Sequence, residues 1–497
     1  MKVQRNPIIA LLLLALGGCN FFSTSNSAST LVGESTIRAK AVAAGYMHAC
    51  ALSPDGDIYC WGDNSSGQLG APFPGMSTGG GSSYLARAVS DPDPSDRWVQ
   101  VEVAMVRSCG IKASGRVYCW GANQYYEIGH SLTDAAPVLT PREIFWFERI
   151  SASDYRLRSF NNPNAKLVMG DYTTCVYTPG ATEYICWGYV GNPNDNSFVE
   201  WQNSPATPWS ECLVLGLCKD SGNYYSLPRK SKFMNNGRPI VNLTIMASSP
   251  CMTYRETSTQ TLARCKGDFY TITPSATHEV SLSLNSYLVP LFYKQHDVDG
   301  PGDVRYDTRC TYSANAAIKN HRCHFYGIMD ADGRPDKILT LNMWFDGGNN
   351  VASKTMTDPR KGWSLGQHSL HQAWGQYLYS YFSCMLDSQR DLRCSSTSVT
   401  SFTPVYVDDS NANFSKDLIV DGWFLAPPNG DLTHAAAVGT TSFARPIKQY
   451  ALGYAFACAV LDDGRVQCLG YNNQGQSGLS LEHSEAPLTF IEANTTQ

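Results

Sequence analysis

A motif built around a pair of cysteines recurs along this chain of 497 residues. Residues 42–70 read VAAGYMHACALSPDGDIYCWGDNSSGQLG, and related strings occupy residues 103–129 and 452–478. Residues 167–188 hold a fourth, more divergent copy. Internal repetition of this kind predicts a repeat architecture, in which each copy forms one supersecondary unit that must stack on its neighbours.

Seven cysteine pairs carry the repetition through the rest of the chain, where the motif fades. The first cysteines of successive pairs are 59 to 76 residues apart, which fits one such unit plus loops of variable length. Two further cysteines can close a small loop, and Cys19 stands alone near the N-terminus. The predicted disulfides are Cys50–Cys60, Cys109–Cys119, Cys175–Cys186, Cys251–Cys265, Cys310–Cys323, Cys384–Cys394, Cys458–Cys468 and Cys212–Cys218.

Three of the pairs have a spacing that a tight hairpin explains. Between Cys50 and Cys60, a three-residue loop ends on Gly56, and glycine supplies the positive φ that this last loop position needs. Gly115 and Gly464 occupy the same place in two other pairs. Because directly opposed residues of an antiparallel pair come within disulfide distance, each of these hairpins predicts one cross-strand disulfide.

The other pairs depart from that spacing. Cys384 and Cys394 flank a loop without glycine, and Cys265 follows Cys251 by 14 residues. Zinc binding is the rival use of so many cysteines, but the chain has no C-x-x-C pair and begins with an export signal. Disulfides formed outside the cytoplasm are therefore the better interpretation.

Both faces of the predicted hairpin are apolar, so such a sheet cannot stand in water alone and must stack on others. The clearest motif copies lie near the two ends of the chain, as a ring that joins its ends requires. We therefore predict an all-β fold, a seven-bladed β-propeller with one hairpin disulfide per blade. In the first copy one face carries Cys50, Leu52, Ile58 and Cys60, and the other carries Ala51, Tyr59 and Trp61.

The first copy resembles the regulator of chromosome condensation repeat. The match is good again in the second and last copies and weak from about residue 190 to 450. The resemblance implies a seven-bladed ring in which the motif residues build turns and contacts between blades. His48 is accordingly expected to be buried and hydrogen-bonded rather than a catalytic base. The matching residues are Gly45, His48, Asp55, Gly56, Trp61, Gly62, Asn64, Gly67, Gln68, Leu69 and Gly70.

The N-terminus reads as a secretion signal, with Lys2 and Arg5 before a short apolar run that ends in Leu-Gly-Gly-Cys19. This ending resembles the bacterial lipobox, which implies cleavage before Cys19 and acylation of that cysteine. Residues 1–18 are thus predicted to be the signal peptide, 19–35 a lipidated cysteine with a flexible tether, and 36–497 the propeller. Asn20 favours sorting to the outer membrane. An ordinary signal-peptidase site would instead leave a secreted protein with a free thiol.

Charge and motifs exclude several functional classes. The formal net charge is −5 and no long basic run occurs, so nucleic acid is not an expected partner. No nucleophile elbow, H-E-x-x-H motif or phosphate-binding loop occurs in a context that would support it, so no catalytic residue is predicted.

Two segments share the pattern D-x-D-G-x-x-D. Oxygen ligands at alternate positions around a glycine turn can wrap Ca²⁺, although the distal acid of an EF-hand is absent. The simpler interpretation is a pair of Asp-Gly turns, and no other cofactor is expected. The candidate ligands are Asp297, Asp299, Asp303, Asp330, Asp332 and Asp336.

Three predicted insertions, at about residues 71–98, 189–240 and 340–380, exceed the length of a turn. Long loops on a rigid scaffold commonly carry binding, and Tyr and Trp provide contact area at low entropic cost. The candidate binding residues are Trp201, Trp209, Tyr224, Tyr225, Trp344, Trp363 and Trp374.

The sequence thus favours a binding module that is anchored to the outer membrane by its lipid alone and recognises a protein or a glycan. Two alternatives stay open. One is an enzyme inhibitor, since a secreted propeller of the resembled family blocks β-lactamases. The other is a glycan-active enzyme with carboxylates in the central channel. The sequence does not distinguish the periplasmic from the surface side, name the ligand or give the oligomeric state.

Overall fold

A computed structural model of the chain places its regular elements. All of these are β-strands, and none of the described residues forms a helix that could cross a membrane. The structure describes residues 34–71, 80–124, 126–130, 134–149, 155–189, 224–231, 235, 237–246, 249–266, 277–282, 284–297, 320–329, 335–344, 353–357, 367–368, 382–386, 392–396, 440–441, 447–453, 456–470, 472–478, 491–492 and 494–496.

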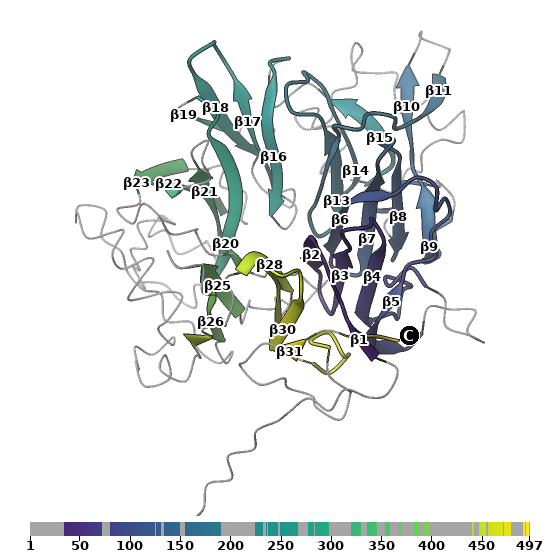
Figure 1. The fold of residues 1–497 in the computed structure, drawn as a ribbon. Helices are drawn as coiled ribbons and strands as arrows, with labels where there is room; N and C mark the ends of the chain where they lie inside the picture. Colours follow the sequence, from purple (N-terminus) through teal and green to yellow (C-terminus); the bar gives the residue numbers. More distant parts are fainter. Residues whose placement is uncertain are drawn as a thin grey trace, which may run out of the picture. The chain divides into compact units, whose positions relative to one another are not determined.

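The described strands, labelled in Figure 1, form seven sheets, five of four strands and two of six. The five regular sheets are β6 (Trp98–Ala104), β7 (Arg107–Lys112), β8 (Val117–Gly121) and β9 (Val138–Glu143); β16 (Ile240–Met246), β17 (Ser249–Arg255), β18 (Thr261–Lys266) and β19 (Thr277–Leu282); β20 (Tyr287–Asp297), β21 (Asn320–Met329), β22 (Pro335–Trp344) and β23 (Ser353–Thr357); β24 (Gln367–His368), β25 (Phe382–Leu386), β26 (Leu392–Ser396) and β27 (Thr440–Thr441); and β28 (Ile447–Gly453), β29 (Phe456–Leu461), β30 (Val466–Gly470) and β31 (Ile491–Glu492).

Each six-stranded sheet is the same four-stranded unit with two strands added at one edge. The first unit is β2 (Ala41–Ala44), β3 (His48–Leu52), β4 (Ile58–Asp63) and β5 (Ser82–Ala88), extended by β32 (Asn494–Thr496) and β1 (Glu34–Thr36). The other is β12 (Lys166–Met169), β13 (Thr173–Tyr177), β14 (Tyr184–Tyr189) and β15 (Tyr224–Ser231), extended by β10 (Phe145–Arg149) and β11 (Tyr155–Ser159). The C-terminal β32 pairs with both β1 and β5, so the last residues of the chain complete the first sheet.

The structure corrects the predicted insertions and the end of the tether. Strand β5 lies inside 71–98, β15 inside 189–240, and part of β22 with all of β23 and β24 inside 340–380. These are mostly outer strands, which carry neither the cysteine nor the tryptophan of the motif and so have no local signature. Glu34 and Ser35, assigned to the tether, pair in β1.

The predicted hairpin register is confirmed. Cys50 faces Cys60, and the equivalent cysteines of β7 with β8 and of β29 with β30 also face each other. Gly56, Gly115 and Gly464 have φ of 85°, 90° and 85° at the turns. The described disulfides are Cys50–Cys60, Cys109–Cys119, Cys175–Cys186, Cys251–Cys265 and Cys458–Cys468, with Cα atoms 4.0 to 4.1 Å apart.

The remaining predicted pairs are only partly within the described residues. Cys384 and Cys394 face each other in the β25–β26 register. Cys323 lies in β21, whereas Cys310, Cys212 and Cys218 lie outside the described residues. Their disulfides stay predictions.

The two faces of the first hairpin pack against different neighbours, as its alternation predicts. Cys50 and Leu52 belong to a buried cluster with residues of β6 to β8, whereas Ala51 and Trp61 cluster with residues of β28 to β30. Both sides of the sheet are therefore covered by other sheets. The first strands of the seven sheets also contact one another in a closed order, namely β2, β6, β12, β16, β20, β24, β28 and again β2. This architecture is a β-propeller.

Candidate functional site

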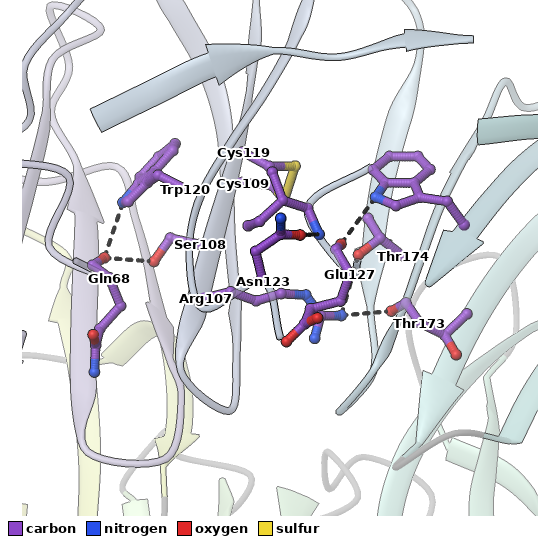
Figure 2. The surroundings of a disulfide bond; sticks show 12 residues. Gln68, Arg107, Ser108, Cys109, Cys119, Trp120, Asn123, Glu127, Thr173 and Thr174 are labelled. Atoms are coloured by element: carbon purple, nitrogen blue, oxygen red, sulfur yellow. Dashed lines mark hydrogen bonds between the residues drawn. A yellow bond between two sulfur atoms is a disulfide. The ribbon is translucent and has the colours of Figure 1, made fainter. Parts of the chain in front are cut away.

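The motif tryptophans join neighbouring sheets through one repeated hydrogen bond. The indole Nε1 of Trp120 donates to the backbone oxygen of Gln68 at 2.9 Å (Figure 2). Trp187 donates in the same way to Glu127 at 3.1 Å, and Trp61 donates to Gln476 at 3.0 Å. Each acceptor lies in the loop that follows the third strand of the preceding unit, and the third contact links the first sheet to the last.

A glycine at the end of each such loop allows the tryptophan to approach. A Cβ atom at Gly70 would lie 2.7 Å from Nε1 of Trp120, and one at Gly129 would lie 2.5 Å from Trp187. Both glycines have positive φ. Any larger residue would therefore push the indole away from its carbonyl acceptor.

His48 is buried between the first two sheets, as predicted, and takes part in the same framework. Its Nε2 lies 2.9 Å from the hydroxyl of Ser108, and that hydroxyl donates to the backbone oxygen of Gln68 at 2.9 Å. The side chain is 0% exposed. This histidine is out of reach of solvent and packs between the first two sheets, as expected.

Arg107 occupies the position of His48 in the second unit, because it faces Gly121 as His48 faces Gly62. Its guanidinium is buried and donates to the backbone oxygen of Thr173 (Figure 2). It also donates to the backbone oxygens of Gly170 and Asp171 and to the hydroxyl of Thr174. Burial lowers the pKa of Arg107 to about 10, against the opposing effect of nearby Glu127, so the side chain stays charged at neutral pH.

Amide side chains join the first strands of neighbouring sheets. Gln449 accepts from the backbone N–H of Val42 at 2.7 Å and donates to its oxygen at 2.8 Å. Gln100 makes the same two contacts with Leu167, at 3.0 and 2.8 Å. A side-chain amide that mimics a strand backbone in this way extends hydrogen bonding from one sheet to the next.

Among the titratable groups on these first strands, Glu102 has the pKa that its environment shifts most. It is partly buried on β6, where the side-chain amide of Gln100 donates to its Oε1 at 2.9 Å. Burial raises its pKa to about 7, although that hydrogen bond opposes the rise. A single carboxyl without a described second acid opposite it provides no general acid–base pair.

An ionic cluster fixes the loop between β5 and β6. The ammonium of Lys112 lies 2.7 Å from Asp91 and 3.8 Å above the ring of Trp98. Arg116 pairs with both Asp93 and Asp96. The Ser95 hydroxyl and Arg116 lower the pKa of Asp93 to about 2, so it stays charged under all ordinary conditions. These groups pair with one another and fasten the loop to the second sheet.

Comparison with known families agrees with this framework. The model of the regulator of chromosome condensation (RCC1) repeat matches residues 39–68, 107–127 and 447–476, the segments that contain His48, Arg107 and the motif loops. The chain thus contains RCC1 repeats in these three segments. The resemblance stated from the motif residues is thereby confirmed.

Curated relatives with RCC1 repeats share short segments with the chain. Human HERC4, a probable E3 ubiquitin-protein ligase, is 28% identical over 157 residues, which cover 22% of this chain and 15% of the relative. The mouse RCC1 domain-containing protein 1 is 29% identical over 128 residues, with coverages of 19% and 33%. The chain therefore spans a third or less of the length of these relatives.

Solved structures align along most of the chain at low similarity. Yeast RCC1 (Prp20), crystallised with Kap60, has a TM-score of 0.38 and 13% identity, and covers 92% of this chain and 75% of its own. Human WBSCR16 has a TM-score of 0.38 and 12% identity, with coverages of 91% and 81%.

The predicted binding aromatics lie mostly beyond the described part of this RCC1-repeat protein. Trp201, Trp209, Trp363 and Trp374 are outside it. Tyr224 and Tyr225, predicted in a loop, are instead the first residues of β15, and Trp344 is the last residue of β22. These three belong to blade strands, and no described geometry brings them together.

The predicted calcium ligands are similarly divided. Asp297 ends β20 and Asp336 lies in β22, whereas the other four aspartates fall outside the described residues. Within the described part of the chain, no three His, Cys, Asp or Glu side chains cluster closely enough to hold a metal ion. Calcium binding stays a prediction.

Sequence reasoning missed Arg107, Glu102 and the amide contacts of Gln100 and Gln449. An alignment of the copies gives a signal for Arg107, because the string MHAC of the first copy corresponds to VRSC in the second. The same alignment relates Gln100 and Gln449, since each lies nine residues before the first cysteine of its copy, whereas Glu102 has no counterpart in the last copy.

Proposed function

We propose that this RCC1-repeat protein is a closed seven-bladed propeller that acts as a binding module for another protein and has no catalytic activity of its own. The observation that carries this proposal is the use of the motif side chains. His48, Arg107, Trp61 and Trp120 are buried and bonded between blades, so they build a scaffold and leave recognition to the surface.

The blade count has independent support. There are seven sheets, their first strands contact one another in a closed order, and the two additional strand pairs extend blades rather than form new ones. In six of these sheets the two cysteines of a predicted pair face each other on the second and third strands, whereas Cys323 on β21 faces Lys294 and Asn342.

The Leu-Gly-Gly-Cys19 string supports attachment to the outer membrane through a lipidated Cys19. A Cys19→Ala chain should then lose outer-membrane fractionation. Unchanged fractionation of this variant would contradict the anchor while leaving the binding function untouched.

Crosslinking of the full-length chain on intact cells, followed by mass spectrometry, tests the binding function. We expect one envelope protein to be enriched, and enrichment to fall at least tenfold in a Trp201→Ser/Trp209→Ser variant. Leu284→Ser is the matched control, since it removes a 37% exposed apolar side chain outside the predicted insertions. If no protein is enriched over the uncrosslinked sample, the chain is not a protein-binding module.

A further inference from the structure

The hairpin of β10 and β11 is an addition to its blade. Five residue pairs join β10 to β11, from Phe145 opposite Ser159 to Arg149 opposite Tyr155. Strand β10 also pairs with β15, whereas β11 is the last strand of the sheet order. Among the described strands, β11 therefore has a partner on one edge only (Figure 1). Such an edge presents a row of backbone N–H and C=O groups that can accept another strand.

One face of this hairpin is apolar and open to solvent. Leu157 is 55% exposed and Phe145 is 39% exposed, and both are among the few large apolar side chains described as exposed. The register puts Leu157 opposite Phe147, which is two residues from Phe145, so Leu157 and Phe145 share one face. In a strand added beside β11, every second side chain would lie on the same face of the sheet as Leu157.

The other face of the hairpin carries two arginines on β11 and one acid, Glu148, on β10. Arg156 and Arg158 are both exposed and alternate with Leu157 along β11. Glu148 lies opposite Arg156 and pairs with Arg158 at 2.6 Å. The ammonium of Lys230 lies 3.0 Å from Glu183 and 4.6 Å from the ring centre of Trp146. These contacts are solvent-exposed, and exposed ion pairs hold their partners weakly. Incoming carboxylates can therefore compete for the arginines.

The charges of Arg156 and Arg158 disfavour the pairing of β11 with the same strand of a second copy of the chain. In an antiparallel pair of two β11 strands centred on Leu157, each Arg156 would face the Arg158 of the other copy. Like charges directly opposite each other in a sheet are destabilising. An acidic strand in the same place would instead put a carboxylate opposite each arginine and an apolar residue opposite Leu157.

We propose that β11 is a docking edge for an extended segment of a partner protein in which apolar and acidic side chains alternate. The segment joins the blade as an additional strand, with its backbone on the edge of β11 that no described strand covers and its acids beside Arg156 and Arg158. This inference rests on the proposed binding function and adds the chemical nature of the partner and the place where it docks.

Fluorescence polarisation of the full-length protein with labelled, capped heptapeptides provides the test. The probe alternates valine with glutamate, and its control alternates valine with lysine. We expect the glutamate peptide to bind at least tenfold more tightly. The Arg156→Glu/Arg158→Glu variant should reverse this preference, and an unchanged thermal unfolding curve should accompany the reversal because both side chains are exposed.

Two N-methylated forms of the glutamate peptide distinguish strand addition from simple charge attraction. Methyl groups on alternate residues block one edge of the peptide only, so one form should lose binding at least tenfold and the other should retain it. Equal binding of both forms overturns the strand-addition proposal, as does equal affinity for the glutamate and lysine peptides. If the crosslinked partner is still enriched by the Arg156→Glu/Arg158→Glu variant, the chain is a binding module that docks elsewhere.

Discussion

At the scale of single residues, Glu102 is expected to make the stability of the propeller depend on pH. Its pKa of about 7 in the folded chain exceeds the ordinary value of 4.5, because burial disfavours the charged form. The folded state thus holds this proton more tightly than the unfolded state. The resulting stabilisation is fully present below about pH 4.5 and is lost as the pH rises through 7.

The Glu102→Gln variant isolates this effect, since glutamine keeps the oxygen that accepts from Gln100 and cannot ionise. Urea unfolding at pH 5 and pH 8 gives the free energy of unfolding of the wild type and of the variant. We expect the wild-type value minus the variant value to fall by on the order of 1–3 kcal/mol from pH 5 to pH 8. Glu256→Gln, which removes an exposed carboxylate paired with Arg238, controls for the loss of one charge. A pH-independent difference between wild type and Glu102→Gln would show that the carboxyl is well solvated.

At the scale of the element, the hairpin disulfide is expected to contribute to stability beyond the strand pairing that surrounds it. Cys109 and Cys119 are 0% exposed and their bond spans a separation of ten residues. A Cys109→Ala/Cys119→Ala variant should lose about 2–4 kcal/mol of unfolding free energy, because the unfolded chain regains freedom that the crosslink denies it. Urea denaturation measures the loss, and the wild type under reducing agent should lose more because every bond opens. A variant within about 0.5 kcal/mol of the oxidised wild type would contradict this role.

The same elements show what the sequence could and could not predict. The hairpins were predictable because their signals are local: a two-residue alternation and a glycine such as Gly56 at the turn. The outer strand β5 carries no such signal, so the sequence alone predicts an insertion in its place. The hydrogen-bond acceptors of Arg107 lie 63 to 67 residues further along the chain, so no local pattern reports them. The β10–β11 hairpin has no counterpart in the motif copies and therefore could not be inferred from the repeat.

At the scale of the whole molecule, a closed ring requires the contact between its two ends to be as strong as the contacts within it. Trp61 and Trp120 provide a matched pair: both are 0% exposed and donate to a glutamine backbone oxygen in the preceding blade. The hydrogen bond of Trp61 joins residues 415 apart in sequence and that of Trp120 joins residues 52 apart.

Trp61→Phe and Trp120→Phe should each cost about 2–4 kcal/mol of unfolding free energy, since both leave a buried carbonyl unpaired and a small cavity. In an open array, by contrast, the first blade would separate from the last before global unfolding, so Trp61→Phe would cost almost nothing. Equal losses in urea denaturation, with a single transition in both variants, are therefore the result expected of a ring; a loss confined to Trp120→Phe would mean that the ends do not hold each other.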